Sequence, residues 1–445
     1  MEITRTLARY VLASRYADIP REVKHEAARS FLNWVGCAVG GARHETVERA
    51  LAALKAFSGP AEASVLGRND RVDIMLAALM NGITSHTFDF DDTHLRTVIH
   101  PSGPVASAIL ALAERTKVTG EDFMHAFILG VEVECRIGNA VYPQHYDVGW
   151  HITGTAGVFG AAAAAGKLLG LDEQQMVWAL GIAATQSSGL REMFGTMSKP
   201  FHPGNAARNG LLAALLAQQN FTSSNQGIEA KRGFANVLST KFDPAQITDN
   251  LGKTFEISIN TYKPFACGIV IHPIIDGCIQ LRNAHQLKVE DIEGIDVKVH
   301  PLVLELTGKK TPQVGLEGKF SVYHSAAVAV IHGAAGEEEY SDAAVRDPRV
   351  TGLRDRVSAT VDPSVHEDQA RIAIRLKSGK TVETFVEHAI GSLARPMSDA
   401  DLEAKFRGLA KGILGPAATD KLIALCWRAE SLADAAEVAR AAATR

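Results

Sequence analysis

The alternation of apolar and polar residues predicts helix after helix over the first 230 residues of the chain. Downstream of Pro20, apolar residues recur every four positions, as on the buried face of a helix: Val23, Ala27, Phe31 and Val35. Further helices are predicted over Asp73 to His86 and Pro104 to Ala113, from Thr119 onward, and after Asp172 and Pro203. Residues 153–170 are mostly small, which indicates close contact between helices rather than a phosphate-binding loop.

The pattern changes after about residue 255. Residues 295–299 alternate like a strand, and residues 372–376 alternate before a turn at 377–380 and a return strand at 381–386. Helices are predicted over 269–281 and 320–331. A helical pattern of apolar residues returns after Ser398, which is predicted to be an N-cap. The sequence therefore predicts a mainly α fold with an inserted α+β domain. Its parts are an all-helical domain built from residues 1–265 and 396–445, and an α+β lid domain at 266–395.

Composition and charge narrow the class of protein. A chain of 445 residues is too long for one ordinary core, and its 46% hydrophobic and 22% charged residues are typical of globular proteins. A formal net charge of −4 and the lack of any Lys/Arg run argue against a nucleic-acid partner. Neither a signal peptide nor an 18-residue apolar stretch is evident, so we expect no membrane partner and a cytoplasmic location.

The cysteine pattern argues against a disulfide framework, a zinc ribbon or an iron–sulfur cluster. The five cysteines form no C-x-x-C pair and are odd in number: Cys37, Cys135, Cys267, Cys278 and Cys426. We predict that they are buried apolar thiols.

Ionisable residues concentrate in four segments that are otherwise apolar. The first runs from His86 to Pro101 and holds three carboxylates within four residues, those of Asp89, Asp91 and Asp92. Three carboxylates so close together are costly to bury. The segment is therefore a solvated loop, a metal site, or an acid/base site in which one carboxyl has a raised pKa, and the sequence leaves these three open.

The second and third segments bring phenolic or basic side chains to the start of predicted helices. Tyr146 and His151 precede the small-residue helix, where a lone histidine is most often structural. Lys199 and His202 lead into the helix after Pro203. A helix N-terminus binds anions because its free N–H groups point outward, although a capped loop with a solvated lysine is the alternative here.

The fourth segment lies where the two hydrophobic patterns meet. It holds Tyr262, Lys263, Cys267 and His272. Clefts between domains are preferred sites for small ligands, although an ordinary hinge would occupy the same place in the chain. Together the four segments supply lysine and histidine for holding carboxylates, and aspartate, histidine and tyrosine for proton transfer.

Taken in order along the chain, these segments resemble the MmgE/PrpD family. The matching motifs are D-F-D-D-T at 89–93 followed by His100-Pro101, a histidine at 151 before T-G-x-x-G-x-x-G, K-P-x-H-x-G-x-A at 199–206, and K-P-F-x-x-C at 263–267 followed by His272. Four linked motifs in one order are far more specific than any one alone. The resemblance implies the helical domain from both chain ends, the inserted lid, a homodimer, and no cofactor.

The resemblance also implies a reaction class. Family activities include 2-methylcitrate dehydration, cis-aconitate decarboxylation and iminodisuccinate epimerisation, all at a carbon next to a carboxylate. A small-molecule polycarboxylate substrate and no metal are therefore implied. The site residues that carry over from the family are Asp89, Thr93, His100, His151, Lys199, Lys263 and His272.

Two departures from the family pattern point to one branch. The stretch between Thr93 and His100 looks one residue longer than in the decarboxylase and dehydratase branches, and it adds Arg96. The position of the family's active-site tyrosine falls on His324. Together with the sequence of residues 263–272 and the total length, these departures make the chain look most similar to the iminodisuccinate epimerase branch.

Epimerisation without a cofactor needs a base on one face of the reacting carbon and an acid on the other. We predict Lys199 and Tyr146 as this pair, because burial or nearby cations would lower the pKa of the lysine toward neutrality. His100, His151 and Asp89 complete the predicted catalytic set by holding carboxylates or orienting a histidine. The predicted substrate-binding residues are Asp91, Thr93, Arg96, Lys263, His272 and His324.

Two alternatives to the epimerase stay open. One is a lyase of the same family, either a 2-methylcitrate dehydratase or a cis-aconitate decarboxylase, and the other is a non-catalytic helical scaffold or binding protein.

Overall fold

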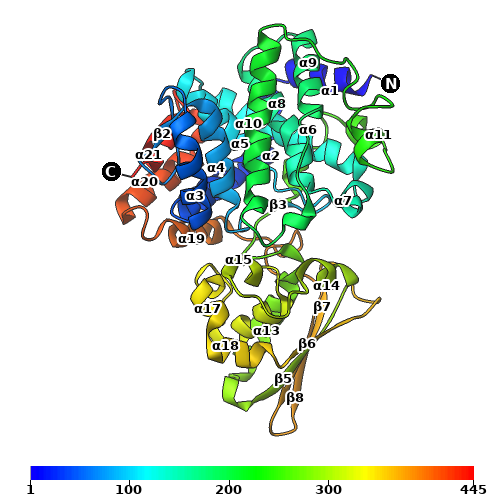
Figure 1. Cartoon of the computed structure of the whole chain (residues 1–445), viewed down its shortest axis with the longest axis vertical. Coiled ribbons are helices and arrows are strands. Elements are labelled where there is room, and N and C mark those ends of the chain that lie inside the picture. The colour runs from blue at the N-terminus through cyan, green and yellow to red at the C-terminus, as the bar shows by residue number, and fades with distance from the viewer. Residues whose placement is uncertain (1, 445) are drawn as a thin grey trace.

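The computed structural model describes residues 2–444 as a large helical body above a smaller part that contains a sheet (Figure 1). The N-terminal helices of the body are α1 (Ile3–Ala13), α2 (Arg21–Gly41), α3 (Glu45–Leu54), α4 (Ile74–His86), α5 (Ser102–Arg115), α6 (Gly120–Val141), α7 (Gln144–Val148), α8 (Ile152–Leu168), α9 (Glu173–Ala184) and α10 (Ser198–Gln218). Within the described residues, no helix is both long and apolar enough to cross a membrane. The helices predicted over 73–86, 104–113 and after Thr119 and Asp172 are confirmed.

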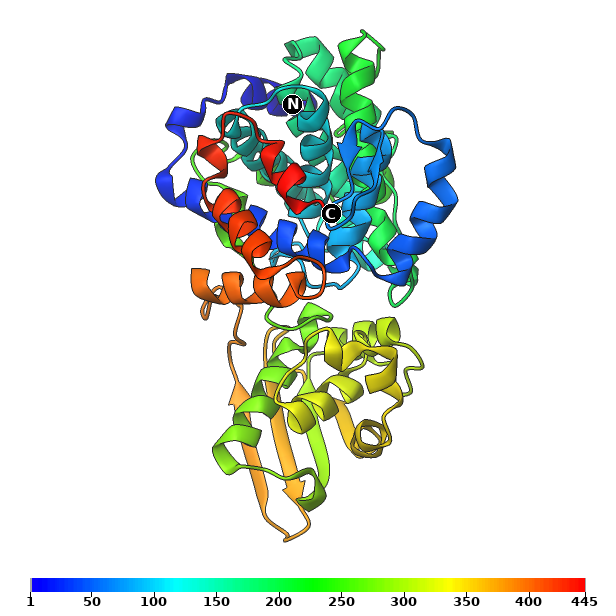
Figure 2. The ribbon, with the colours of Figure 1, turned by 90° about the vertical axis from the view of Figure 1, so that its left-hand side faces the viewer.

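The C-terminal helices return to this body. They are α19 (Asp399–Ala410), α20 (Pro416–Trp427) and α21 (Glu437–Ala442), and α19 packs against α2. Figure 2 shows this last part of the chain lying on the N-terminal helices, above the sheet. Ser398 is the N-cap of α19, as predicted: its hydroxyl accepts the Asp401 N–H in a capping box.

The smaller part is built on one four-stranded mixed sheet. Its strands are β5 (Ile292–Val299), β6 (Val357–Val361), β7 (Ala370–Leu376) and β8 (Thr381–Val386), in the order β6-β5-β7-β8. Strands β5 and β6 are parallel, and the other pairs are antiparallel. Helix α13 (His272–His285) packs against β7 and β8, and α16 (Val322–His332) packs against α13 and β6.

The predicted strand at 295–299 and the hairpin at 372–386 are confirmed, whereas β6 was not predicted. This strand lies at the edge of the sheet and buries only its first residue fully, so its apolar pattern is weak. The mainly helical fold with a small sheet in the C-terminal region is confirmed. The domain boundaries at 265/266 and 395/396 remain a prediction.

The small residues of α8 allow the closest helix contacts in the body. A Cβ added at Gly210 of α10 would lie 2.4 Å from the Cβ of Ala161 of α8, so a larger residue there would push the two helices apart. This confirms the crowded core predicted for residues 153–170.

Helix α10 starts at Ser198, so the predicted start at Pro203 is wrong and this proline lies inside the helix. All five cysteines are free and buried, as predicted.

Candidate active site

A cavity of about 50 Å³ lies between the helical body and the smaller part. The body contributes all the ionisable residues of the lining, together with two apolar ones. These residues are Asp89, Val98, His100, Tyr146, His151, Phe194, Lys199 and Lys263. The smaller part covers them with mostly apolar residues: Gly268, Ile269, Val270, Leu302, Leu306, Thr307 and Phe320. The space is far below the roughly 300 Å³ of common small-molecule sites.

Two backbone contacts bring the predicted segments together. Strand β3 (Thr93–His94) pairs with β4 (Asn260–Thr261), which puts the acidic segment next to the segment of Lys263. Helices α4 and α10 touch at glycines: a Cβ added at Gly82 would lie only 2.4 Å from the Cα of Gly204. This close approach allows His86, at the end of α4, to meet Lys199 in the first turn of α10.

Asp89 is the centre of the site, because two buried lysines donate to the same carboxylate oxygen. The Nζ atoms of Lys199 and Lys263 each lie 2.8 Å from Asp89 Oδ1. Burial alone would raise the pKa of Asp89, but the two ammonium groups outweigh it and hold this pKa well below its usual range. Burial and the charge of Lys263 lower the pKa of Lys199, while Asp89 opposes the shift. Among the residues that line the cavity, two lysines therefore face one carboxylate.

A hydrogen-bonded chain runs from Asp91 through His86 to Lys199. The ammonium of Lys199 donates to His86 Nε2 at 2.9 Å, so His86 Nδ1–H donates to Asp91 Oδ2 at 2.8 Å. Burial lowers the pKa of His86, which therefore stays neutral in this chain. Asp91, predicted as a substrate-binding residue, contacts His86 and does not line the cavity.

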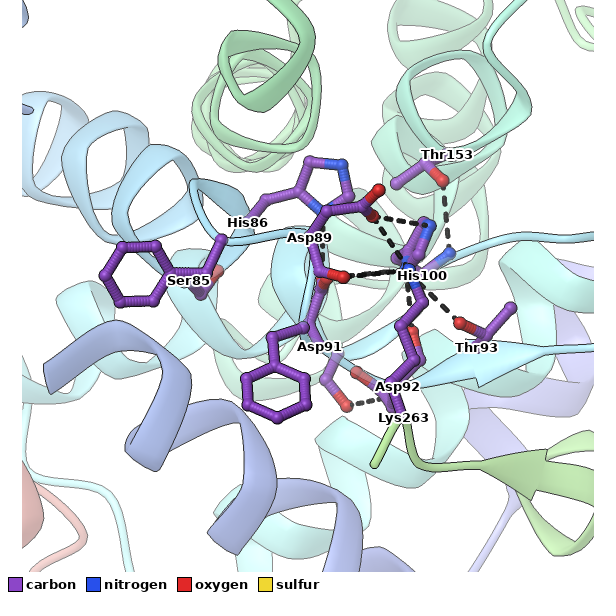
Figure 3. Close-up of polar contacts among 12 residues, drawn as sticks. Ser85, His86, Asp89, Asp91, Asp92, Thr93, His100, Thr153 and Lys263 are labelled. Atoms are coloured by element: carbon purple, nitrogen blue, oxygen red, sulfur yellow. Dashed lines mark hydrogen bonds and ion pairs between the residues drawn. The ribbon is translucent and has the colours of Figure 1, made fainter. Parts of the chain in front are cut away.

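His100 presents a free ring nitrogen to the cavity. Its Nδ1–H donates to the Asp92 carbonyl at 2.9 Å, and its backbone N–H donates to the Thr153 hydroxyl at 3.1 Å (Figure 3). Burial lowers the pKa of His100 well below its usual value, and nearby Lys263 lowers it further. The imidazole is therefore neutral, and Nε2, which lies 3.8 Å from Asp89 Oδ1, carries a lone pair that can accept a proton.

His151 and Tyr146 also line the cavity. His151 shares a hydrogen bond of 2.8 Å with His202, Nδ1 to Nδ1, and burial holds its pKa well below the usual value. The Tyr146 ring lies under the guanidinium of Arg191, at 4.1 Å from its centroid. Burial raises the pKa of Tyr146, so its hydroxyl stays protonated and can act as an acid.

The acidic segment is not a solvated loop. Asp89 is 4% exposed, and Asp91 and Asp92 are fully buried. Each carboxyl is accommodated differently: Asp89 by lysines, Asp91 by a histidine, and Asp92 by hydrogen bonds from Ser102 and Asn260. Burial and the neighbouring charge of Asp91 raise the pKa of Asp92 to about 7. The carboxyl with the raised pKa is therefore one that does not line the cavity.

Besides Asp91, four predicted binding residues within residues 2–444 do not line the cavity. Thr93 lies behind His100, 3.5 Å from its Nδ1, and His272 faces a neighbouring groove. Arg96 is exposed, and its guanidinium lies 3.8 Å from the carboxylate of Glu256. The His324 ring lies 2.9 Å from the carbonyl of Glu339. Both side chains therefore contact partners away from the cavity in this structure, and their substrate contacts stay a prediction.

The buried cluster also has the composition of a metal site. Ligand atoms of His86, Asp89, Asp91 and His100 lie within 4.8 Å of one another. Two of these ligands already accept from ammonium groups, since Asp89 is bonded to two lysines and His86 to one. A cation would have to approach two ammonium charges at close range, which is unfavourable in a buried site. The donor set therefore fits an anionic ligand better than a metal ion.

Three lysines cap three consecutive carbonyls of the acidic segment, and sequence reasoning missed two of them. The hydrogen bonds run from Lys319 to Phe88 (2.8 Å), from Lys263 to Asp89 (3.0 Å) and from Lys405 to Phe90 (2.5 Å). Asp89 has a φ of 52°, a left-handed conformation that costs roughly 1–3 kcal/mol for residues other than glycine. The three bonds hold the backbone in this conformation.

Lys319 and Lys405 also join the acidic segment to the fourth segment. Lys319 donates to the carbonyl of Ala266 at 2.8 Å, and Lys405 donates to that of Lys263 at 2.9 Å. Lys319 lies between α15 (Gly315–Gly318) and α16, and Lys405 lies in α19, so both come from elements remote in sequence. No local sequence pattern identifies either residue, because only their hydrogen bonds in the folded protein indicate a role.

Replacing Lys405 with methionine is expected to lower kcat about tenfold and to change KM less. The change leaves two buried carbonyls unpaired, at roughly 1–3 kcal/mol each, and lets Asp89 relax from its left-handed conformation. Steady-state kinetics from pH 6 to 9 measure the effect, and Lys405→Arg should restore part of it. A folded Lys405→Met protein with the wild-type kcat and pH profile would contradict the positioning role.

Two family models and several known proteins are similar to this chain over most of its length. Models of the MmgE/PrpD N-terminal domain and the MmgE/PrpD C-terminal domain match residues 5–247 and 265–429. A cis-aconitate decarboxylase of Homo sapiens is 27% identical over 450 residues, covering 97% of this chain and 92% of the relative. A cis-aconitate decarboxylase-like protein of Aspergillus oryzae is 26% identical, covering 98% and 96%. A 2-methylcitrate dehydratase of Cupriavidus necator is 24% identical, covering 76% and 75%.

Proposed function

Since the chain belongs to the MmgE/PrpD family, we propose that it is a lyase that removes carbon dioxide or water from a small polycarboxylate. Relatives that align over more than nine-tenths of both chains are named as decarboxylases or as decarboxylase-like. This supports decarboxylation of an unsaturated tricarboxylate of the cis-aconitate type as the first reaction to test. The lyase replaces epimerisation as the leading function, because the named relatives are lyases.

The observation that carries the proposal is the pair of buried ammonium groups on one carboxylate. Lys199 and Lys263 both donate to Asp89 Oδ1 at 2.8 Å, inside the cavity. Because Asp89 neutralises only one of the two charges, a substrate carboxylate gains a favourable partner there. Such fixed charges stabilise negative charge that develops in a reaction without costly reorganisation.

The same residues can carry out the proton transfers. In a decarboxylation, the bond to the departing carboxylate breaks and its electron pair forms a new double bond to the adjacent carbon. The electron pair of the former double bond then takes up a proton at the carbon beyond. The ammonium of Lys199, held by His86, is a suitable donor for this proton. In a dehydration, the neutral His100 would remove the proton next to the carboxylate through Nε2, and an acid would protonate the departing hydroxyl.

One feature favours epimerisation as a second candidate. Tyr146 lines the same cavity as Lys199, and burial keeps its hydroxyl protonated. A tyrosine acid and a lysine base are the pair predicted for proton exchange at the α-carbon of iminodisuccinate. The two candidates differ in products, since an epimerase releases neither carbon dioxide nor water.

The test is proton NMR of EDTA-treated enzyme in D2O with cis-aconitate, 2-methylcitrate and single stereoisomers of iminodisuccinate. Release of carbon dioxide or a new olefinic product, lost in Lys199→Met, would support the lyase. Exchange of the α-proton with appearance of the other diastereomer, and no olefin, would support the epimerase instead. Product formation from none of the three substrates would contradict both.

Three expectations rest on the sequence or the family resemblance alone. They are a homodimer, the absence of a cofactor, and a cytoplasmic location. Light scattering of the purified chain tests the first, and the activity retained after EDTA treatment tests a metal requirement.

A further inference from the structure

An apolar groove of about 480 Å³ adjoins the catalytic cavity. The two spaces share a wall of four apolar residues: Val98, Ile269, Val270 and Leu302. We propose that this groove is a subsite for an apolar substituent of the substrate, so that the substrate is a polycarboxylate bearing an alkyl chain. The inference rests on the proposed function, because the carboxylates are anchored in the adjoining cavity.

The chemistry of the groove selects an alkyl chain over another charged group. Besides the shared wall, its lining includes Leu95, Pro273, Ala389 and Ile390. Its lining also includes His300 and His366, and its exposed edge carries the carboxylates of Glu367 and Asp368, which would repel a further carboxylate. An alkyl chain avoids this repulsion and gains about 0.8 kcal/mol, or nearly fourfold in affinity, for each methylene removed from water.

A buried and unpartnered polar atom lies where the groove meets the catalytic residues. His272 is 2% exposed, and its Nε2 has no hydrogen-bond partner among residues 2–444. It lines the groove, and the charges of Lys263 and Asp89 both act on its ring. A buried polar group without a partner is costly, which indicates that a ligand completes it. The ligand would contact His272 between its carboxylates and its chain.

The wall between the two spaces contains a strained residue. Val98 has a φ of 53°, an outlier for a β-branched side chain, and lies in the loop between Thr93 and His100. Such strain persists where the surrounding structure requires a particular side-chain position. Val98 faces both the cavity and the groove, so its side chain sets how a substituent passes from one to the other.

A second groove on the cavity is less suited to an alkyl chain. It measures about 680 Å³ and meets the cavity at Phe194 and Leu306. Its lining includes five charged residues, Asp147, Arg191, Glu192, Glu305 and Lys309, and Arg191 and Glu305 form an ion pair at 2.6 Å. An alkyl chain would desolvate these charges without compensation.

The test measures binding rather than turnover, so that it is independent of the reaction catalysed. Dissociation constants of succinate and its 2-alkyl derivatives, from methyl to hexyl, are measured by calorimetry with the full chain. We expect affinity to rise by up to about fourfold per methylene. Ile390→Trp, or Ser392→Trp if the first variant does not fold, should abolish this rise without weakening succinate. Leu304→Trp, which fills the charged groove, should leave the rise unchanged.

The outcomes separate this inference from the proposed function. Binding of succinate with no dependence on chain length would overturn the alkyl subsite and leave the polycarboxylate site intact. A chain-length effect abolished by Leu304→Trp but not by Ile390→Trp would assign the substituent to the charged groove and also overturn the inference. Failure of succinate and all derivatives to bind would count against both proposals.

Discussion

Replacing Lys199 with methionine is expected to lower turnover by about a thousandfold, within the 10²–10⁴ range for loss of a general acid or base. The substitution removes the ammonium that faces Asp89 at 2.8 Å and His86 at 2.9 Å, and it introduces no group that can transfer a proton. Asp89 keeps Lys263 as a partner, so its carboxylate is not left unpaired. The fold should therefore survive. Turnover of the substrate identified by NMR, together with thermal unfolding, measures both expectations.

Lys167 provides a matched control for the loss of a lysine charge. Its ammonium donates to three carbonyls at the end of α1, those of Val11, Leu12 and Ser14, and does not line the cavity. Lys167→Met should therefore lower stability more than turnover, the reverse of Lys199→Met. Equal turnover in Lys199→Met and wild type would remove Lys199 from the mechanism. Equal losses in both lysine variants would mean that the effect is not specific to the site.

Replacing Arg136 with methionine is expected to lower the free energy of unfolding by about 3–5 kcal/mol, as when one partner of a buried ion pair is removed. Arg136 is 2% exposed and pairs with Glu132 one turn earlier on α6. Its guanidinium also donates to carbonyls of the 247–254 loop, including Asp249 at 2.8 Å. Methionine fills similar space but leaves these carbonyls unpaired and removes the counter-charge of Glu132, which keeps the Glu256 N–H as a donor. Urea unfolding measures the change.

Two controls test the buried network. Arg5 pairs with Glu173, which is 39% exposed, so Arg5→Met should cost no more than about 1 kcal/mol. Glu132→Gln keeps the shape and removes one charge. Burial raises the pKa of Glu132 to about 7 even beside Arg136, so neutralising this side chain should cost less than removing the arginine. A free energy of unfolding for Arg136→Met within about 1 kcal/mol of wild type would show that water replaces the lost bonds.

The proposed activity and the alkyl subsite depend on residues from different parts of the protein. The proposed catalysis uses the two lysines, His100 and Asp89 on the side of the body, whereas the groove takes most of its wall from the smaller part. Changes in the smaller part could therefore alter the accepted substituent without moving the groups that transfer protons. Ile390 is a direct test of this separation, because it lines the groove and not the cavity.

The sequence by itself determined the elements and most of the chemical groups. Apolar periodicity predicted the long helices, since burial of one helix face imposes that period whatever the rest of the chain does. The hairpin of β7 and β8 was predictable because its strands alternate and its turn is local. The order of four motifs selected Asp89, His100, His151, Lys199 and Lys263, and all five line one cavity.

Only the tertiary structure decided which of these groups meet and how they are charged. Arg96 and His324 have the chemistry of substrate ligands, but each finds a closer partner elsewhere, Glu256 and the Glu339 carbonyl. Lys405 lies in a helix with no local sign of function, yet it donates to the acidic segment more than 300 positions away in the chain. The pKa of a buried group depends on the charges within a few ångströms of it, and contacts between distant segments supply those charges. Local pattern therefore predicts the helices and the candidate residues, whereas long-range packing makes Asp89 an anion between two lysines and His100 a neutral base.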